Sequence, residues 1–420
     1  SLVADNITID GTEIDLSSGT LTIDAASITL DASDSISTTT AGTSNVKLGA
    51  NAGNSITSGG NYNTVIGDEA GTALTTGDAN VAVGFEALKT EDANGESVAV
   101  GYQALKAQNA GASGLNTAVG YLAGTAVTTG VRNTFVGANA GDALTEGAQN
   151  VGVGREALGA DTLGSNSVAV GNSALRVQNL TTATDVYNVA VGDQAGIAVT
   201  TGINNVLVGG LAGDAITDAD FNVAVGTYAL SSNVLGSQST ALGHAALFTQ
   251  NPTTATNMYN VAIGANAGNA ITTGVDNTIM GSLAGDALTE GGSNVAIGFS
   301  AMSAQTTASE NVAVGRDALV SNLTGTGLTA IGHAALTAST GNNNTALGNR
   351  SGVAVTSGAD NTFVGKNAGG SINTASSNVA IGTDALDGDT KGSFSVAIGG
   401  GALGAQNFST ATGSQNTAVG

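Results

Sequence analysis

The stretch Asn80-Val81-Ala82-Val83-Gly84-Phe85-Glu86-Ala87-Leu88 is one copy of a phrase that repeats from Asn45 to the last residue. Its glycine, called here the repeat glycine, recurs at 49, 67, 84, 101, 120, 137, 154, 171, 192, 209, 226, 243, 264, 281, 298, 315, 332, 348, 365, 382, 399 and 420. These are 22 copies, and most steps between them have the same length as the step from Gly67 to Gly84. A unit this short cannot bury a core of its own and must stack on its neighbours. The repeat therefore predicts an all-β solenoid over residues 45–420, a parallel β-roll or β-helix with about 17 residues per turn.

Residues 1–44 follow a different rule and form a separate predicted segment. Apolar pairs two residues apart, such as Ile7 and Ile9, recur every seven residues. This is the spacing of strands, whereas a helical heptad places its apolar residues three and four apart. We expect a run of very short strands here, followed by a junction rich in Ser and Thr.

The composition disfavours several classes of function. The net charge is −22, and both nucleic acid and anionic membrane need a basic surface on their partner. Cysteine is absent, so the chain has no disulfide and no thiolate metal site. Ser1 is not followed by a charged and then apolar leader, so we expect no signal peptide. No apolar run is long enough to span a bilayer, so we expect no membrane insertion.

The three residues before each repeat glycine have the pattern of a strand. Position −1 is always aliphatic and position −3 is always Val or Thr, and this uniformity suggests that both columns face the inside of the coil. Position −2 lies on the other face, yet it is Ala in 15 of 22 copies and larger in several others. A strand that is apolar on both faces is buried on both. We therefore predict that the −2 column is a subunit interface, with Ala82, Phe135, Leu207, Ile279 and Phe363 as its marked members.

Position −4 is Asn in 17 of 22 copies. Identical amides stacked on successive strands can hydrogen-bond along the column, as in other cross-β stacks. The alternative is a turn residue that tolerates left-handed backbone geometry. The first interpretation predicts a structural ladder that includes Asn80, Asn133, Asn150, Asn205 and Asn222.

The turns after the repeat glycine come in two kinds. Position +3 is almost always Ala, and position +4 alternates in pairs between Gly and Leu, giving a cassette of four turns such as the one from Gly120 to Gly192. In glycine turns the missing apolar side chain reappears three residues later, as Val127 does after Gly124. One loop per cassette is longer than the others. Since loops vary without disturbing a core, we predict receptor contact there, at Gln178, Asn179, Tyr187, Gln250 and Tyr259. The alternatives are that these loops are spacers relieving twist, or that binding lies outside this chain.

The residues that could support catalysis occupy structural positions. The two histidines, His244 and His333, stand in the same slot after a repeat glycine, each followed by Ala-Ala-Leu. Carboxylates such as Glu86 recur two residues after the glycine and are expected on a solvated face. No EF-hand spacing or calcium-binding nonapeptide occurs. We therefore expect no enzyme activity, no metal and no cofactor.

The repeat Asn/Ser-Val/Thr-Ala-Val/Ile-Gly-x-x-Ala, as in residues 80–87, resembles the head repeats of YadA-like trimeric adhesins. The longer form in residues 129–141, and the phrase in residues 7–16, are similar to segments of bacteriophage tail fibres. This resemblance implies a homotrimeric phage tail fibre on the virion that serves host attachment. It also implies as partners the chain itself, other tail proteins and a cell-surface glycan or protein receptor. An alternative is a bacterial surface trimeric adhesin or extracellular filament subunit. A tailspike depolymerase would need a groove with paired carboxylates and aromatic platforms, and 14 Phe and Tyr residues spread over the coil argue against it.

Overall fold

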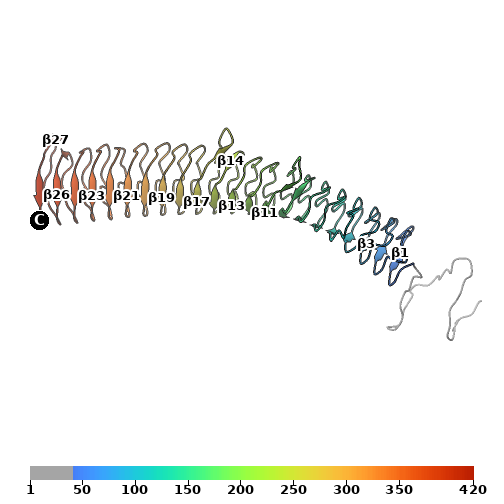
Figure 1. Cartoon of the computed structure of the whole chain (residues 1–420). Helices are drawn as coiled ribbons and strands as arrows, with labels where there is room; N and C mark the ends of the chain where they lie inside the picture. Colours follow the sequence, from blue (N-terminus) through green and yellow to red (C-terminus); the bar gives the residue numbers. More distant parts are fainter. Residues whose placement is uncertain (1–40) are drawn as a thin grey trace, which may run out of the picture. The chain divides into compact units, whose positions relative to one another are not determined.

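The structure, a computed structural model, describes residues 41–420, which form one stack of coils (Figure 1). Each coil contributes one three-residue strand, and the 22 strands form a single parallel sheet. Every one of these strands occupies positions −3 to −1 before a repeat glycine. The predicted all-β solenoid with about 17 residues per turn is therefore confirmed. The segment predicted at 1–44 lies outside the described residues, apart from its last four.

The strands of the main sheet follow one another in chain order. They are β1 (Val46–Leu48), β2 (Thr64–Ile66), β3 (Val81–Val83), β4 (Val98–Val100), β5 (Thr117–Val119), β6 (Thr134–Val136), β7 (Val151–Val153), β9 (Val168–Val170), β11 (Val189–Val191), β12 (Val206–Val208), β13 (Val223–Val225), β15 (Thr240–Leu242), β17 (Val261–Ile263), β18 (Thr278–Met280), β19 (Val295–Ile297), β20 (Val312–Val314), β21 (Thr329–Ile331), β22 (Thr345–Leu347), β23 (Thr362–Val364), β24 (Val379–Ile381), β26 (Val396–Ile398) and β28 (Thr417–Val419).

Six two-residue strands lie in loops and pair two by two, also in parallel. They are β8 (Gly164–Ser165) with β10 (Thr184–Asp185), β14 (Gly236–Ser237) with β16 (Thr256–Asn257), and β25 (Gly392–Ser393) with β27 (Thr412–Gly413). The second strand of each pair lies in one of the lengthened loops. These loops are thus tied to the preceding coil by backbone pairing.

Equivalent positions of successive repeats stack directly on one another. In the pairing of β3 with β4, Val81 lies opposite Val98 and Ala82 opposite Ala99. This register turns each repeat position into a continuous column along the sheet. The residue type and the environment of one position are therefore repeated in every coil of the stack.

The repeat glycine is fixed by its backbone. Gly84 has a φ of +133°, which a residue with a side chain rarely adopts. A Cβ at Gly84 would also lie 2.3 Å from the carbonyl oxygen of Gly101 in the next coil. Any side chain here would push successive coils apart, which explains why all 22 positions are glycine.

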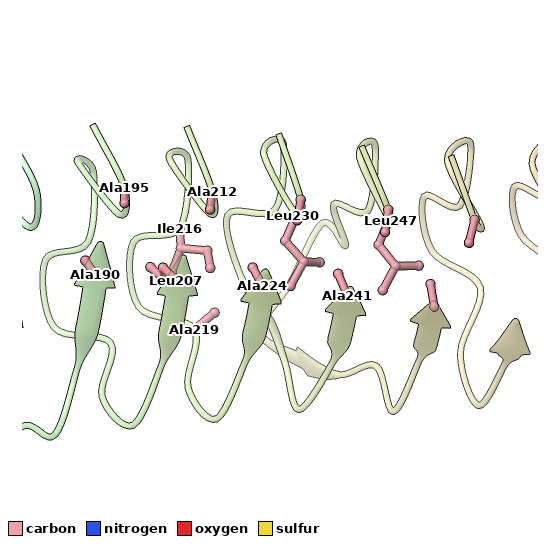
Figure 2. Close-up of a cluster of buried hydrophobic side chains, with 14 of the residues drawn as sticks. Ala190, Ala195, Leu207, Ala212, Ile216, Ala219, Ala224, Leu230, Ala241 and Leu247 are labelled. Atoms are coloured by element: carbon pink, nitrogen blue, oxygen red, sulfur yellow. The ribbon is translucent and has the colours of Figure 1, made fainter. Parts of the chain in front are cut away.

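The two faces of each strand are the reverse of the predicted ones. Ala82 is fully buried inside its own coil, whereas Val81 and Val83 are partly exposed. Figure 2 shows the same arrangement farther along, where Ala190 and Ala224 point from their strands toward the opposite wall. That wall is lined by the Ala of position +3 and the Leu of position +4, so only a small side chain fits between it and most strands.

The predicted interface residues Ala82, Phe135, Leu207, Ile279 and Phe363 are all fully buried within the chain itself. They belong to its own hydrophobic core, so their assignment to a subunit interface is wrong. The physical reason is the small volume of the coil interior, which selects Ala on the inner face.

The bulky members of this column occupy space left by glycine turns. The ring of Phe135 lies between two consecutive glycine turns, and a Cβ at Gly141 would be only 2.4 Å from its Cε1. A Cβ at Gly124 would be 3.1 Å from its Cδ2. Phe363 lies in the same way between Gly352 and Gly369. The pair of glycine turns in a cassette thus makes room for one large core side chain.

Candidate assembly interface and surface sites

The outward face of the main sheet carries two columns of β-branched and aliphatic side chains. Position −3 supplies Val or Thr, and position −1 supplies Val, Ile, Leu or Met. The longer side chains at −1 are markedly exposed, with 45% for Leu242, 41% for Met280 and 46% for Leu347. No other element among the described residues packs on this face, because the coil interior lies on the opposite side.

The size of this outward face exceeds what single chains usually leave exposed. At about 4.8 Å per strand, 22 strands span roughly 100 Å, and two side-chain columns are roughly 7 Å wide. The resulting stripe has a footprint of roughly 700 Å², in which nine of the 22 residues at position −3 are Thr, and the largest apolar patch on a typical monomer is roughly 300–600 Å². A continuous stripe of this kind is typical of a surface that another polypeptide covers.

The asparagine column at position −4 forms a ladder, but its bonds run mainly between amides and backbone and not, as expected, between the amides themselves. The side-chain oxygens of Asn80, Asn133, Asn150, Asn205 and Asn222 each accept a hydrogen bond from the backbone N–H of the −4 residue in the next coil, at 2.9–3.1 Å. Each side-chain nitrogen donates to a backbone carbonyl 14 residues later, at 2.8–3.1 Å. Direct amide-to-amide bonds are rarer, as from Asn205 to Asn188 at 3.3 Å. The ladder therefore satisfies buried backbone groups rather than linking side chains alone.

The left-handed backbone geometry falls one residue before the asparagine. Position −5 has a positive φ, with +60° at Arg132, +61° at Gln149 and +58° at Phe221, whereas the asparagines that follow them do not. The alternative interpretation of the asparagines as left-handed turn residues is therefore wrong. The left-handed backbone conformation is therefore adopted by residues whose side chains point to solvent.

The residues predicted for receptor contact separate into two groups. Gln178 and Gln250 are fully buried, so neither is available to a receptor, and this part of the prediction is wrong. Gln178 donates to Ser167 Oγ at 3.1 Å and accepts from Asn188 Nδ2 at 2.9 Å. Asn179 is exposed and accepts a bond from the Thr162 hydroxyl at 2.8 Å. The two glutamines anchor the start of their loops to the core.

Tyr187 and Tyr259 are both about half exposed and occupy position −5. Phe221, with the same exposure, stands in the same column between them. Each neighbouring pair in this series is two coils apart, or roughly 10 Å at about 4.8 Å per coil. Our sequence analysis missed Phe221 because it is not in a long loop. Its distance of five residues from the next repeat glycine was the available signal.

A polar slot inside the core was also missed. At position +7, glycine turns carry an apolar residue, but leucine turns, apart from the one with Ser339, carry an acid or amide such as the buried Asp161 followed one coil later by Gln178. The Gln178 side chain donates to Asp161 Oδ2 at 2.5 Å, and Asp161 Oδ1 accepts from the Gly164 N–H at 2.9 Å. Burial nevertheless raises the pKa of Asp161 above its ordinary value. The signal was the regular Glu, Asp, Asn or Gln at this position in leucine turns.

One cassette, from Gly264 to Gly348, has three turns of the leucine kind instead of two, with Met302, Leu319 and Leu336 at position +4, and it breaks this order. Gln305 is fully buried at position +7, and neither its Nε2 nor its Oε1 has a hydrogen-bond partner within the described chain. The preceding coil offers Leu288 and the following coil offers Asn322, whose side chain is bonded to the Gly325 backbone. Gln305 therefore lacks the acid partner that Gln108, Gln178 and Gln406 have in their cassettes.

Four carboxylates at position +2 form ion pairs, namely Glu69, Glu86, Glu156 and Asp317. Glu86 is buried, so its expected place on a solvated face is wrong. Lys106 Nζ lies 2.6 Å from Glu86 Oε2, and Lys89 Nζ lies 2.6 Å from Glu86 Oε1. Lys106 and Lys89 lower the pKa of Glu86 to about 2. The contact of Lys89 with Glu69 and with Glu86 raises the pKa of Lys89 to about 12. A carboxylate held ionised by two lysines is suited to a structural role rather than to proton transfer.

The described part of the chain contains no group of three or more His, Cys, Asp or Glu side chains arranged to hold a metal ion. Among residues 41–420 there is also no helix long and apolar enough to cross a membrane. Comparison of the chain with protein-family models and with curated proteins gives no match.

Proposed function

We propose that this chain is the shaft of a structural attachment fibre, part of a phage tail fibre, and that three copies associate through the outward face of the main sheet. The observation that carries the proposal is the continuous aliphatic column at position −1, beside a column of Val and Thr at position −3, along this face. The number of copies follows the resemblance to YadA-like head repeats. A repeating shaft with few chemical groups in reach of a substrate serves to hold other parts at a distance.

Burial of the apolar face supplies a driving force for association of the chains. Half-exposed Leu, Ile and Met side chains on successive coils would leave water on association, at about 25 cal/mol per Å² of apolar area. The acidic net charge of −22 acts in the opposite direction through self-repulsion. The proposed assembly therefore tightens as salt screens the charge.

The test is the molar mass of the chain and its variants by light scattering coupled to size exclusion. We expect the wild type at three times the chain mass of 40.3 kDa. Leu242→Glu combined with Met280→Glu should yield single chains, because each trimer would bury six unpaired carboxylates. Leu323→Glu is the matched control, since Leu323 is 51% exposed but lies outside every strand. A wild type that elutes as one chain, or a double variant that stays assembled, would contradict the proposed interface.

Labelling with an antibody against the chain tests the biological setting. The proposal expects the label on the tails of phage particles released from an infected culture. Label confined to the envelope of uninfected bacteria would instead support the surface adhesin of the same architecture.

A further inference from the structure

A solvent-facing hollow opens where the turns after β13, β15 and β17 adjoin. It has a volume of about 330 Å³ and is lined by Tyr228, His244, Ala245, Phe248 and Asn269. This volume is at the lower end of the roughly 300–1,000 Å³ that small-molecule sites occupy. The chain has only 14 Phe and Tyr residues in 420, so a hollow with two of them and a histidine is unusual for this surface.

The hollow exists because one side chain is small where its neighbours are large. Ala245 stands at position +2, where the preceding coil has Tyr228, and it is nearly buried as the floor. The ring of Tyr228 lies 6.1 Å from that of His244 at 90° and 6.2 Å from that of Phe248 at 80°. The three rings are therefore set at steep angles around a shared space rather than stacked face to face.

The polar groups of the hollow are few. Asn269 Nδ2 donates to the carbonyl of Ala245 at 3.1 Å, which fixes the orientation of the amide. The Oδ1 of Asn269 can then accept a hydrogen bond from a ligand. The imidazole of His244 and the hydroxyl of Tyr228 add further donors and acceptors. No Asp, Glu, Lys or Arg is among the lining residues.

The turn of the second histidine lacks the aromatic residues that line the hollow, so these residues are not a regular feature of the repeat. His333 is followed by the same Ala-Ala-Leu, so the turn itself is the same. Its neighbours are different: His333 Nε2 lies 3.9 Å from Asp317 Oδ2, and the place of Phe248 is taken by Thr337, which donates to the Ala334 carbonyl at 2.9 Å. The histidine is thus common to both turns, and the aromatic walls belong to one of them.

We propose that this hollow binds a single pyranose ring of an uncharged glycan. The C–H face of a pyranose packs on aromatic rings, and its hydroxyl groups bond to polar side chains such as the Asn269 amide, the His244 imidazole and the Tyr228 hydroxyl. An anionic sugar would be repelled by the net charge of −22 and would find no Lys or Arg in the hollow. A cationic ligand would find no Asp or Glu there. This site is additional to the proposed shaft function and does not depend on the number of copies.

The experiment is saturation-transfer NMR on the full-length wild type with the methyl glycosides of glucose, galactose, mannose and N-acetylglucosamine as probes. We expect transfer to the ring C–H protons of at least one glycoside. Tyr228→Ala and Phe248→Thr should each reduce that transfer to the level of a protein-free blank, whereas His333→Ala should leave it unchanged. Phe248→Thr copies the residue that the His333 turn already holds, so the fold tolerates it.

The two histidines locate the binding directly. In protein labelled with ¹³C at histidine, the active glycoside should shift the ring signal of His244 and leave that of His333 in place. Absence of transfer from all four glycosides, or equal shifts of both signals, would overturn the proposal. A shift of the His244 ring signal on addition of tetramethylammonium chloride, but of no glycoside, would also overturn the proposal and favour a cation site. The molar mass is measured on the same samples, so a failure of the proposed assembly is recognised separately.

Discussion

The position of Phe135 between two glycine turns predicts the outcome of a double-mutant cycle. Phe135→Ala removes a fully buried ring beside glycines that cannot fill the cavity, so we expect the loss of about 3–5 kcal/mol typical of such changes. Gly141→Ala places a Cβ 2.4 Å from the ring and should cost about 1–3 kcal/mol. Backbone strain at the φ of +59° adds to that cost, but the conformation is open to residues with side chains, since Leu88 holds the equivalent position with a φ of +51°.

In the double variant the new methyl group enters the space that the ring has left. The two losses should then fall short of additivity by about 1–2 kcal/mol. Because a long repeat array need not unfold as one unit, the assay is hydrogen exchange with mass spectrometry on peptides from residues 120–171. A change of about 1.4 kcal/mol in local opening alters the exchange rate tenfold. Peptides around Ile279, eight coils away, are the internal control. Strictly additive losses, or a Gly141→Ala variant that exchanges like the wild type, would refute the placement of the ring.

Three further outcomes follow from individual side chains. Asn205→Ala should accelerate local exchange by the equivalent of about 1–3 kcal/mol, because it leaves a buried N–H and a buried carbonyl without partners. Gln305→Leu should slow local exchange, since it removes two unpartnered polar atoms, whereas Gln250→Leu, which breaks bonds to two neighbours, should accelerate it. The lowered pKa of Glu86 means that its ion pairs stabilise the coil fully above pH 4.5 and lose this effect as the pH falls toward about 2. Thermal melts between pH 2 and 6 should therefore show a steeper acid decline in the wild type than in Glu86→Gln.

The repeat alone was sufficient to predict the strands, their register and the ladder. Direct stacking of Val81 on Val98 follows from a fixed period, because equal spacing places the same position at the same point of each coil. The asparagine ladder follows from the same stacking. The hydrogen-bond pattern within it was not predictable from composition, since it depends on which backbone groups each turn leaves unpaired.

The choice of strand face failed because we took uniform aliphatic columns as the mark of the interior. Uniformity of Val and Ile also suits a flat pleated surface that a partner covers, so it does not distinguish inside from outside. Covariation in side-chain size between columns does distinguish the inside of the coil from the outside. Phe135 coincides with glycine at both 124 and 141, and only side chains that share a closed volume need such compensation. The bulky residues and the paired glycine turns were both visible in the sequence, and joining them would have identified the core.

The repeat positions differ in the structural reason that fixes the residue type at each of them. The repeat glycine is required by its φ and by the close approach of the next coil, as at Gly84, and the −4 asparagine by buried backbone groups. The −2 residue is required by core volume. Position −1 is aliphatic in all 22 copies, and β-branched Val and Ile there also suit a strand by themselves. Leu242 and Leu347 are more exposed than that preference explains, and under the proposed assembly a second copy of the chain on this face would cover them.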